Sequence, residues 1–332
     1  MVQESLAKKS TSNRFRTFLW FLQCYLQTLY DYLFPFLVRR KDVRNEIVLI
    51  TGGGSGIGQL MALRFLRLGA KVIVWDINSD GMKQTRLLAE EENFSTEDNL
   101  FTFIVDITKS SEVYAASKRV REEIGPVNIL INNAGVVSGK NLLDISDANI
   151  ELTMKVNVLA HFYTIKAFLP EMIEQQKGHI VTIASVAGDV GVCSLSDYCA
   201  SKFANVGLDL SLRMELAKAD LLDKIKTTIV KPYFISTGMF GGAYPGFFPL
   251  LKPENVADQI VEAILTEQLQ ITLPWYLSWI IALLHWFPSK CLVPINDFMG
   301  GYEWMANFHG RQEPSKMNGS AKLEINNNHI AK

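Results

Sequence analysis

Cysteine is scarce in this chain of 332 residues, and its positions are scattered. The four cysteines form no CxxC pair and no spacing typical of metal ligands; they are Cys24, Cys193, Cys199 and Cys291. This pattern argues against a disulfide scaffold and against a zinc site, so no bound metal is expected.

An excess of charge of either sign is also absent, because 33 lysine and arginine residues balance 34 aspartate and glutamate residues. Proteins that bind nucleic acid carry a basic surface, so the composition predicts no nucleic-acid partner. Intrinsic disorder as the main state is excluded, since 48% of the residues are hydrophobic and 20% are charged. The chain has enough apolar side chains to bury a large core.

A long apolar run, rich in Phe, Leu, Trp and Tyr, spans residues 18–38 and ends in a basic cluster. No Ala-x-Ala-like cleavage site follows it, which argues against a signal peptide. A polar stripe (Gln23, Gln27 and Asp31) opposes a simple membrane-spanning helix. After a polar N-terminus (1–17) we therefore expect residues 18–41 to form a membrane anchor embedded from one face. An ordinary amphipathic helix packed on the core is the alternative.

From residue 46 onward, short β-branched runs alternate with helical stretches, which predicts an α/β fold with a doubly wound parallel sheet, the Rossmann fold. The expected strands are Ile47–Ile50, Lys71–Asp76, Phe101–Asp106, Val127–Ile131, His179–Ser185, Lys226–Lys231 and Gln270–Leu273. Several are apolar on consecutive residues, as strands buried on both faces require. We expect one dinucleotide-binding catalytic domain over residues 46–273.

Two further segments follow this domain. Residues 274–310 form an apolar extension whose aromatic side chains suit either a membrane surface or a helix closing over a substrate pocket. Residues 311–332 are polar and are predicted to be a disordered tail.

A glycine-rich stretch, Thr51–Gly58, directly follows the first expected strand and opens a helix. Glycines at this position allow a tight turn, and the loop and helix N-terminus can meet a pyrophosphate. The residues expected to contact the cofactor here are Gly52, Ser55, Gly56, Ile57 and Gly58.

Asp76 ends the second expected strand, where an acid accepts hydrogen bonds from the adenosine ribose. Neither lysine nor arginine follows before Gly81 to meet a 2′-phosphate, so NAD is favoured over NADP. A helix N-cap is the alternative role for Asp76. At the ends of the next two expected strands, Asp106 and Asn133-Ala134-Gly135 suit the adenine and ribose, although ordinary turns have similar sequences.

Ser185, Tyr198 and Lys202 form the expected catalytic group, because residues four apart share a helix face and Ser185 ends a strand. A tyrosine with a pKa near ~10 needs about 4 kcal/mol of phenolate stabilisation to act as a base at neutral pH. A neighbouring ammonium and a nicotinamide cation supply such stabilisation.

Together these motifs are similar to those of the short-chain dehydrogenase/reductase family, and the resemblance covers residues 46–273. The matching stretches are Thr51–Gly58, Asn132–Gly135, Asn157, Ser185 and Tyr198–Lys202. The resemblance implies that Tyr198 is the acid/base, Lys202 lowers its pKa and binds the nicotinamide ribose, Ser185 positions the substrate and Asn157 holds a relay water.

The same resemblance places Ile235 and Thr237 against the nicotinamide carboxamide. The usual Pro-Gly of the family is Pro232-Tyr233 here, which changes the backbone beside the nicotinamide. Homodimer formation through helices around Ser146–Pro170 and Asp197–Ala217 is implied by the same analogy.

Finer stretches resemble the branch of membrane-bound retinol dehydrogenases and lipid-droplet 17β-hydroxysteroid dehydrogenases; these are Trp75–Asn78, Lys166–Pro170, Asp197–Phe203, Ile225–Pro232 and Thr237–Phe240. This resemblance implies an enzyme that oxidises a hydrophobic alcohol, such as all-trans-retinol or a steroid, at the endoplasmic reticulum or lipid droplets, with its catalytic domain in the cytosol.

Residues 237–253 are apolar but broken by glycine and proline, which independently predicts a flexible lid over an apolar ligand. Two alternatives remain: an NADP(H)-dependent carbonyl or retinal reductase, and a non-catalytic lipid-droplet-associated protein.

Overall fold

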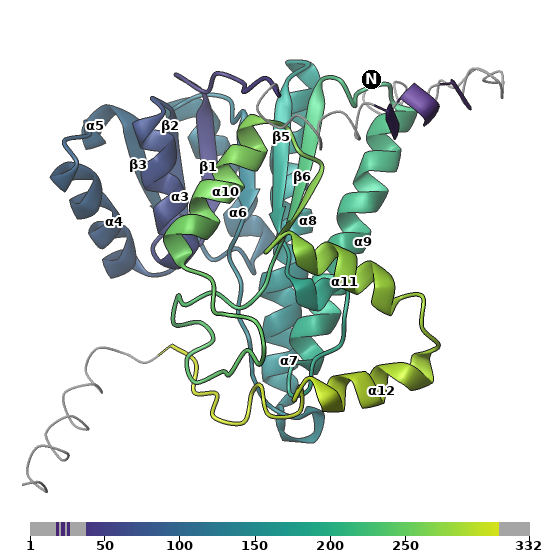
Figure 1. Ribbon diagram of the computed structural model, residues 1–332. Helices are drawn as coiled ribbons and strands as arrows, with labels where there is room; N and C mark the ends of the chain where they lie inside the picture. Colours follow the sequence, from purple (N-terminus) through teal and green to yellow (C-terminus); the bar gives the residue numbers. More distant parts are fainter. Residues whose placement is uncertain (1–17, 20, 24, 27–37, 312–332) are drawn as a thin grey trace, which may run out of the picture.

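A seven-stranded parallel sheet forms the centre of the protein, as the sequence predicts (Figure 1). The computed structural model describes residues 18, 19, 21–23, 25, 26 and 38–311. The strand order is β3-β2-β1-β4-β5-β6-β7, so the order reverses between β1 and β4, where open α/β sheets bind their ligands. The strands are β1 (Ile47–Thr51), β2 (Lys71–Asp76), β3 (Leu100–Ile104), β4 (Ile129–Asn132), β5 (Gly178–Ile183), β6 (Ile225–Pro232) and β7 (Gln270–Leu273).

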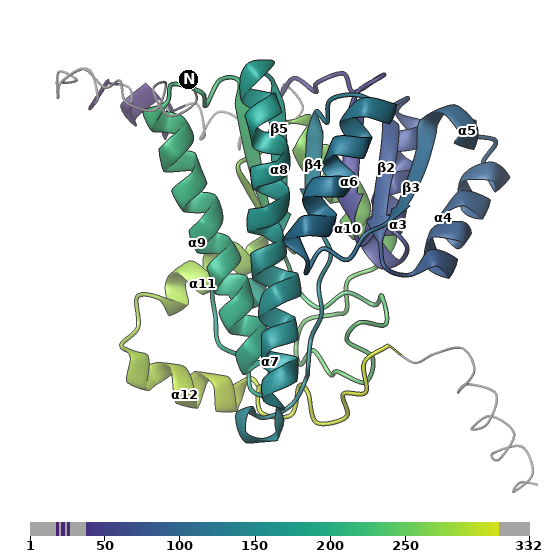
Figure 2. The same cartoon turned by 180° about the vertical axis from the view of Figure 1, so that it is seen from behind.

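Helices cover both faces of the sheet. One face packs against α3 (Gly56–Arg67), α4 (Ser79–Glu91) and α10 (Pro253–Leu265). The other face packs against α6 (Ser110–Glu123), α8 (Ala160–Glu174) and α9 (Ser196–Lys218), which stand in front in Figure 2. Two short helices, α5 (Thr96–Asn99) and α7 (Asp147–Met154), complete this domain. The central strands are buried on both faces, which explains their consecutive apolar residues.

Two expected strands end earlier than predicted. Strand β3 stops at Ile104 and β5 at Ile183, so Asp106 and Ser185 lie beyond the strand ends rather than within them. Each side chain instead organises the turn that follows: Asp106 Oδ1 accepts hydrogen bonds from Thr108, and Ser185 is the N-cap of a short 3-10 helix. The local turn therefore overrides the strand pattern at both positions.

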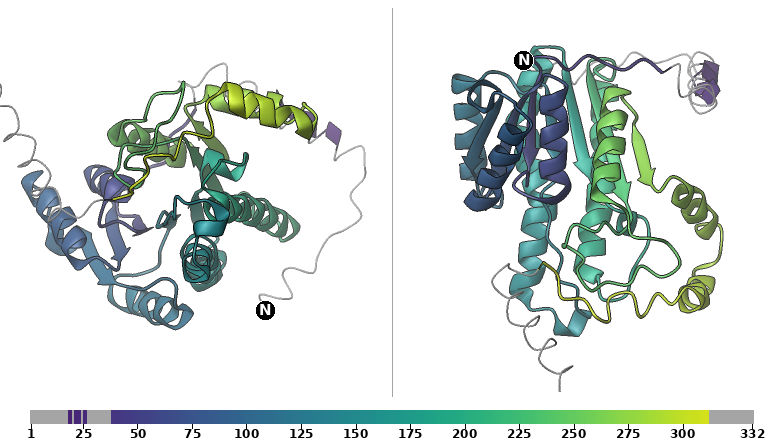
Figure 3. Two further views of the ribbon diagram at one scale, coloured as in Figure 1. Left: turned by 90° about the horizontal axis from the view of Figure 1, so that it is seen from below. Right: turned by 60° about the vertical axis from the view of Figure 1, so that its left-hand side comes forward.

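Helices α11 (Tyr276–Leu284) and α12 (Ser289–Phe298) occupy much of the expected apolar extension. Together with the loop before α10, they lie beyond the carboxyl ends of the strands, as the right-hand view of Figure 3 shows. Several aromatic side chains in and beside these helices are exposed, including Trp275, Trp279, Trp286 and Phe298.

The expected anchor, residues 18–41, lies in large part outside the described residues, and so do the polar N-terminus and residues 312–332. Phe18, Leu19, Phe21, Leu22, Tyr25 and Leu26 are helical, and their side chains are exposed. Within the described part of the chain, no helix is both long enough and apolar enough to cross a membrane.

Candidate active site

A cavity of about 1140 Å³ opens at the carboxyl ends of the strands. It extends from the loop after β1 to the side chains of α11 and α12. Every predicted site residue except Asn157 lines it: Gly52, Ser55, Gly56, Ile57, Gly58, Asp76, Asp106, Asn133, Ala134, Gly135, Ser185, Tyr198, Lys202, Ile235 and Thr237. The fold thus brings residues from almost the whole domain to one place.

The glycine loop between β1 and α3 has the shape that a pyrophosphate site needs. Gly52 and Gly56 adopt left-handed backbone conformations, with φ of +67° and +58°. A Cβ atom at Gly58 would lie 2.3 Å from the Gly52 carbonyl oxygen, so the turn is too tight for a side chain. The cradle of backbone N–H groups at the start of α3 therefore fits the diphosphate of a dinucleotide.

Thr51 and Asn133 join the glycine loop to the end of β4. The Thr51 hydroxyl oxygen accepts hydrogen bonds from the backbone N–H groups of Asn133 and Ala134, at 3.0 and 3.1 Å. The Asn133 side-chain amide donates to the carbonyls of Thr51 and Gly52, at 2.9 and 3.2 Å. Sequence reasoning missed Thr51, although a hydroxyl residue directly before the glycines was a usable signal.

Asp76 lies against the same loop and not at a helix start. Its Oδ2 accepts from the Gly54 N–H at 2.9 Å, and its Oδ1 accepts from the Asn78 N–H at 2.9 Å. The N-cap of α4 is Asn78, so the alternative role considered for Asp76 is wrong. Its carboxylate lines the cavity, where it suits ribose hydroxyls and repels a 2′-phosphate.

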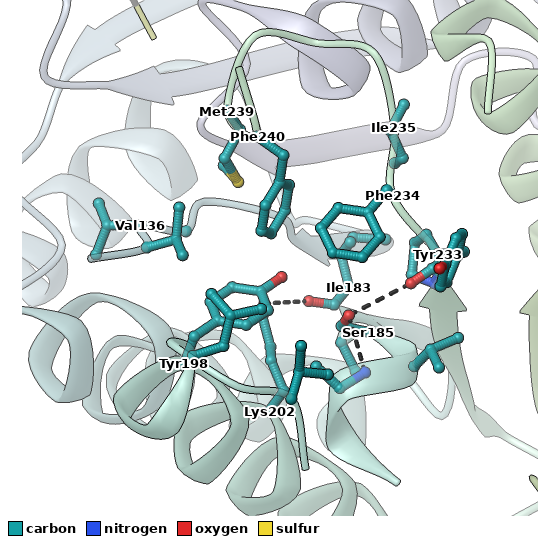
Figure 4. A pocket seen from close by; sticks show the side chains of 18 of the residues that line it. Val136, Ile183, Ser185, Tyr198, Lys202, Tyr233, Phe234, Ile235, Met239 and Phe240 are labelled. Carbon is teal, nitrogen blue, oxygen red and sulfur yellow. Dashed lines mark hydrogen bonds between the residues drawn. The ribbon is translucent and has the colours of Figure 1, made fainter. Parts of the chain in front are cut away.

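Ser185, Tyr198 and Lys202 lie together at the middle of the cavity (Figure 4). Tyr198 stands in the first turn of α9, and the Lys202 Nζ lies 5.5 Å from the centre of its ring. The Lys202 ammonium donates to the Ile183 carbonyl at 2.9 Å. The Ser185 hydroxyl accepts from the Ala187 N–H at 3.1 Å and donates to the Pro232 carbonyl at 3.3 Å, which holds it at the end of β5.

Burial acts in opposite directions on the two titratable groups of this cluster. It raises the pKa of Tyr198 well above its ordinary value, while the Ser185 hydroxyl opposes the rise. It lowers the pKa of Lys202 from 10.5 to about 8. Each group is desolvated, so a phenolate and an ammonium side by side would stabilise one another far more than in water.

Asn157 lies behind the cavity in a π-helical segment, Lys155–Leu159, that joins α7 to α8. Its side chain is fully buried: Oδ1 accepts from the Val136 N–H at 2.8 Å, and Nδ2 donates to the Val136 carbonyl and the Ser201 hydroxyl. Asn157 therefore ties the loop after β4 to α9, and its role in holding a relay water stays a prediction. An interrupted helix of this kind often marks a functional site.

Aromatic side chains form the other end of the cavity. Phe240 of the expected lid packs edge-on against Tyr198 and Phe234, with ring centres 5.6 and 5.0 Å apart. Leu277 and Ile281 of α11 join the same buried cluster. The expected lid has no regular secondary structure between Thr237 and Lys252 apart from an isolated bridge at Leu251. Its side chains pack in one cluster with those of the C-terminal segment, so it does not cover the cavity alone.

Tyr233, which stands where the family has glycine, is the centre of this aromatic cluster. Its ring contacts Phe234, Phe248 and Trp304, and its hydroxyl donates to the Pro245 carbonyl at 2.6 Å. The departure from Pro-Gly therefore attaches the lid to β6, a role that sequence reasoning missed. Next to it, Ile235 forms a bridge to Leu251.

Thr237 lies close to the glycine loop, because a Cβ at Gly56 would lie 3.5 Å from its side chain. Thr237, one of the two residues predicted to contact the nicotinamide, thus lies next to the glycine loop, although the two are far apart in the sequence. A continuous cavity with a backbone-lined polar end, a buried tyrosine and an aromatic end can hold a dinucleotide beside an apolar alcohol.

The family model described as short chain dehydrogenase matches residues 46–245. The chain belongs to the short-chain dehydrogenase family. Epidermal retinol dehydrogenase 2 of Mus musculus is 45% identical over 278 residues, which cover 82% of this chain and 88% of that protein. Estradiol 17-beta-dehydrogenase 11 of Homo sapiens is 42% identical over 269 residues, which cover 81% of this chain and 87% of that protein.

Among solved structures, a short chain dehydrogenase/reductase from Burkholderia phymatum in complex with NAD is similar, with a TM-score of 0.66 and 26% identity. The match covers 74% of this chain and 94% of that one. The predicted family, fold and enzyme class are confirmed: this short-chain dehydrogenase is an oxidoreductase. The names of the two relatives match the predicted branch, and the solved relative holds the predicted cofactor, NAD.

Proposed function

We propose that this short-chain dehydrogenase transfers a hydride from a hydrophobic alcohol of the retinol or steroid type to NAD. The observation that carries the proposal is the position of Tyr198, whose ring packs against Phe240 at the apolar end of a cavity that also contains the glycine loop. The names of the relatives, a retinol dehydrogenase and an estradiol dehydrogenase, support the same class of alcohol.

NAD, when bound, supplies the hydride acceptor. The chain's own residues provide the rest of the chemistry. Tyr198 removes the hydroxyl proton of the alcohol, and the Ser185 hydroxyl, once it turns its proton away from the Pro232 carbonyl, donates a hydrogen bond that holds the alcohol oxygen. Lys202, whose pKa burial lowers to about 8, favours the phenolate by placing its charge beside the ring.

Asp76 supports NAD as the cofactor, because its carboxylate would repel the additional phosphate of NADP. Among the described residues that line the cavity, the lysine and arginine side chains are Lys202 and Arg311, and neither lies next to Asp76 in the sequence. An NADP(H)-dependent reductase is the alternative, and catalytic efficiencies with NAD and NADP distinguish the two.

We also propose that the enzyme works at a lipid surface, on the endoplasmic reticulum or on lipid droplets, with its catalytic domain in the cytosol. Helix α11 supports this proposal, because one side of it lines the cavity and other apolar side chains of it are exposed. Leu277 and Ile281 line the cavity and are buried, whereas Trp279 and, just after the helix, Trp286 are 63% and 90% exposed. An alcohol dissolved in lipid would then enter the cavity directly.

Substitution of both Trp279 and Trp286 by Glu tests lipid entry. The KM for a retinoid delivered in phosphatidylcholine vesicles should rise about tenfold, since two exposed aromatic side chains that insert into the lipid contribute a few kcal/mol to interfacial binding. The KM for a water-soluble alcohol should stay unchanged. Leu143→Glu is the matched control, because Leu143 is 97% exposed and lies outside α11. Equal KM values for vesicle-borne retinoid in all three proteins contradict the proposal.

A homodimer is proposed through α8 and α9, where Phe162, Phe203, Leu210 and Met214 are exposed apolar side chains. Exposed apolar side chains gathered on two helices are typical of interaction sites. Leu210→Glu together with Met214→Glu should convert a dimer to a monomer in light scattering. A wild-type protein that is already monomeric in a detergent that preserves activity contradicts this assembly.

The central experiment measures reduced-nicotinamide absorbance while membranes that contain the protein oxidise all-trans-retinol, estradiol and a fatty alcohol in the presence of NAD. Turnover of at least one of these alcohols is expected in the wild type and not in Tyr198→Phe. Wild-type membranes that turn over none of them contradict the proposed function. A lipid-droplet phenotype restored equally well by Tyr198→Phe favours a non-catalytic droplet-associated protein.

A further inference from the structure

The chain after α12 returns across the carboxyl side of the sheet as a strap, defined here as residues 304–311 (yellow in Figure 1). The strap is hydrogen-bonded to the lid. The His309 and Gly310 N–H groups donate to the Gly241 carbonyl at 2.9 and 3.2 Å, and the Tyr244 N–H donates to the Trp304 carbonyl at 2.7 Å. Lid and strap therefore form one layer over the cavity.

Glycines on the facing loops make room for this strap. A Cβ at Gly242 would lie 1.9 Å from the Asn307 carbonyl oxygen, and a Cβ at Gly139 would lie 2.1 Å from the Phe308 ring. Both positions have positive φ, so a side chain there would be strained as well as too close. The strap is therefore held in a defined position between the lid and the loop after β4.

Arg311 is the last residue of the strap and lies beside the glycine loop. Its Nη1 donates to the Ser55 hydroxyl at 2.8 Å. Its Nη2 lies 3.8 Å from the place of a Cβ at Gly56, and its Cγ lies 3.9 Å from the place of a Cβ at Gly238. Arg311 lines the cavity, and within residues 38–311 no carboxylate forms an ion pair with it.

We propose that Arg311 binds the pyrophosphate of the dinucleotide from the end of the strap. This inference rests on the proposed function, because it assumes the same cofactor site. Arg311 donates to Ser55, and its Nη2 lies close to Gly56, the first residue of α3, whereas Asp76 accepts from Gly54. The guanidinium is therefore at the start of α3, where the backbone N–H groups fit a diphosphate and its planar donors match phosphate oxygens.

The glycine loop carries no basic side chain of its own, and Arg311 brings one to it from a distant part of the chain. The glycine loop supplies N–H groups, and the strap supplies the positive charge that a diphosphate favours. Because lid and strap share hydrogen bonds, cofactor binding would also order the layer beside the alcohol.

Direct binding of NADH tests the proposal, with energy transfer from tryptophan to bound NADH as the readout in the full-length protein. Arg311→Ala should raise the Kd for NADH about tenfold, as expected when a partly exposed charge-assisted hydrogen bond is lost. Arg311→Lys should recover part of the affinity. Arg119→Ala, which removes an arginine from the outer surface of α6, should leave the Kd unchanged.

Competition assays locate the contact on the dinucleotide. ADP-ribose should lose affinity for Arg311→Ala by the same factor as NADH, whereas adenosine should lose none. A loss confined to NADPH would place Arg311 at the 2′-phosphate and overturn the proposal, as would equal NADH affinities for wild type and Arg311→Ala. A wild type that binds no NADH at all overturns the proposed function itself, so the two failures are distinguishable.

Discussion

The two ends of the cavity are built in different ways. The cofactor end uses short segments at the ends of β1, β2 and β4, in which backbone groups and three polar side chains hold one another in place. The alcohol end uses the lid, α11 and the strap, whose residues are brought together from positions 233 to 308 by aromatic contacts. Each loop of the cofactor end is a short segment, whereas the alcohol end is assembled from residues that lie far apart in the sequence.

This difference follows from the ligands. A diphosphate is bound by backbone N–H groups at fixed positions, so few loop shapes and few residue types are tolerated. An apolar alcohol is bound by surface area without direction, so many combinations of Phe, Leu and Trp serve equally well. The cofactor end, with its recognisable glycine motif, and the alcohol end, with its variable apolar surface, meet at Tyr198.

The largest effect is expected where the two ends meet. Tyr198→Phe should reduce turnover by about 10²- to 10⁴-fold, because the acid/base group is lost while the ring remains. NADH binding should be unchanged, as measured by energy transfer from tryptophan. Tyr163→Phe removes a phenol from α8 away from the cavity and should retain full turnover. Substantial activity in Tyr198→Phe contradicts its role as the acid/base.

A smaller effect is expected at the cofactor end alone. Asp76→Asn should shift the ratio of kcat/KM for NAD to that for NADP by about 10- to 100-fold toward NADP, because a charged hydrogen-bond acceptor and its repulsion of phosphate are removed together. Steady-state kinetics with both cofactors measure this ratio. Asp80→Asn, an exposed acid on α4, is the control and should leave it unchanged. An unaltered ratio in Asp76→Asn argues for another determinant of cofactor choice.

At the alcohol end, Phe240→Ala should raise the KM for the apolar alcohol about tenfold, since a phenyl group that the bound alcohol buries fully contributes about 1.5–3 kcal/mol. NADH affinity should stay constant, which separates the two ends. Phe247→Ala, at an exposed position of the same lid, should alter neither quantity. If Phe240→Ala weakens NADH binding as much as alcohol binding, the two ends are not independent.

The smallest effect is expected for the free energy of unfolding, and it involves the binding of neither the cofactor nor the alcohol. Burial lowers the pKa of His161 to about 3, so below its ordinary pKa of 6.5 the unfolded chain binds a proton that the folded chain does not. The free energy of unfolding should therefore fall as the pH falls from 6.5 toward 3, by up to about 1.4 kcal/mol per pH unit from this group. Buried His179 acts in the same direction.

Urea unfolding at several pH values measures this slope. His161→Asn should make it shallower than in the wild type, whereas His285→Asn, at an exposed position, should not. Equal slopes in wild type and His161→Asn would show that another group controls the acid sensitivity.

Much of the fold was predictable because its signals are local. Consecutive apolar residues mark the buried strands, and the position of the glycine loop after a strand, the Tyr-x-x-x-Lys spacing and the family resemblance together predict the site. The errors lie at strand ends: Asp106 and Ser185 were assigned to strands, because a pattern of β-branched residues does not show where a side chain will cap the next turn instead.

The sequence by itself determined the sheet and the cofactor loop and predicted the candidate catalytic residues, since the patterns that mark them lie within a few positions of one another. Only the tertiary structure decided that Asn157 binds Val136 and Ser201, that Tyr233 holds the lid, and that Arg311 reaches Ser55. Those contacts join segments separated by up to 256 positions, and packing between distant segments leaves no periodic trace in the chain.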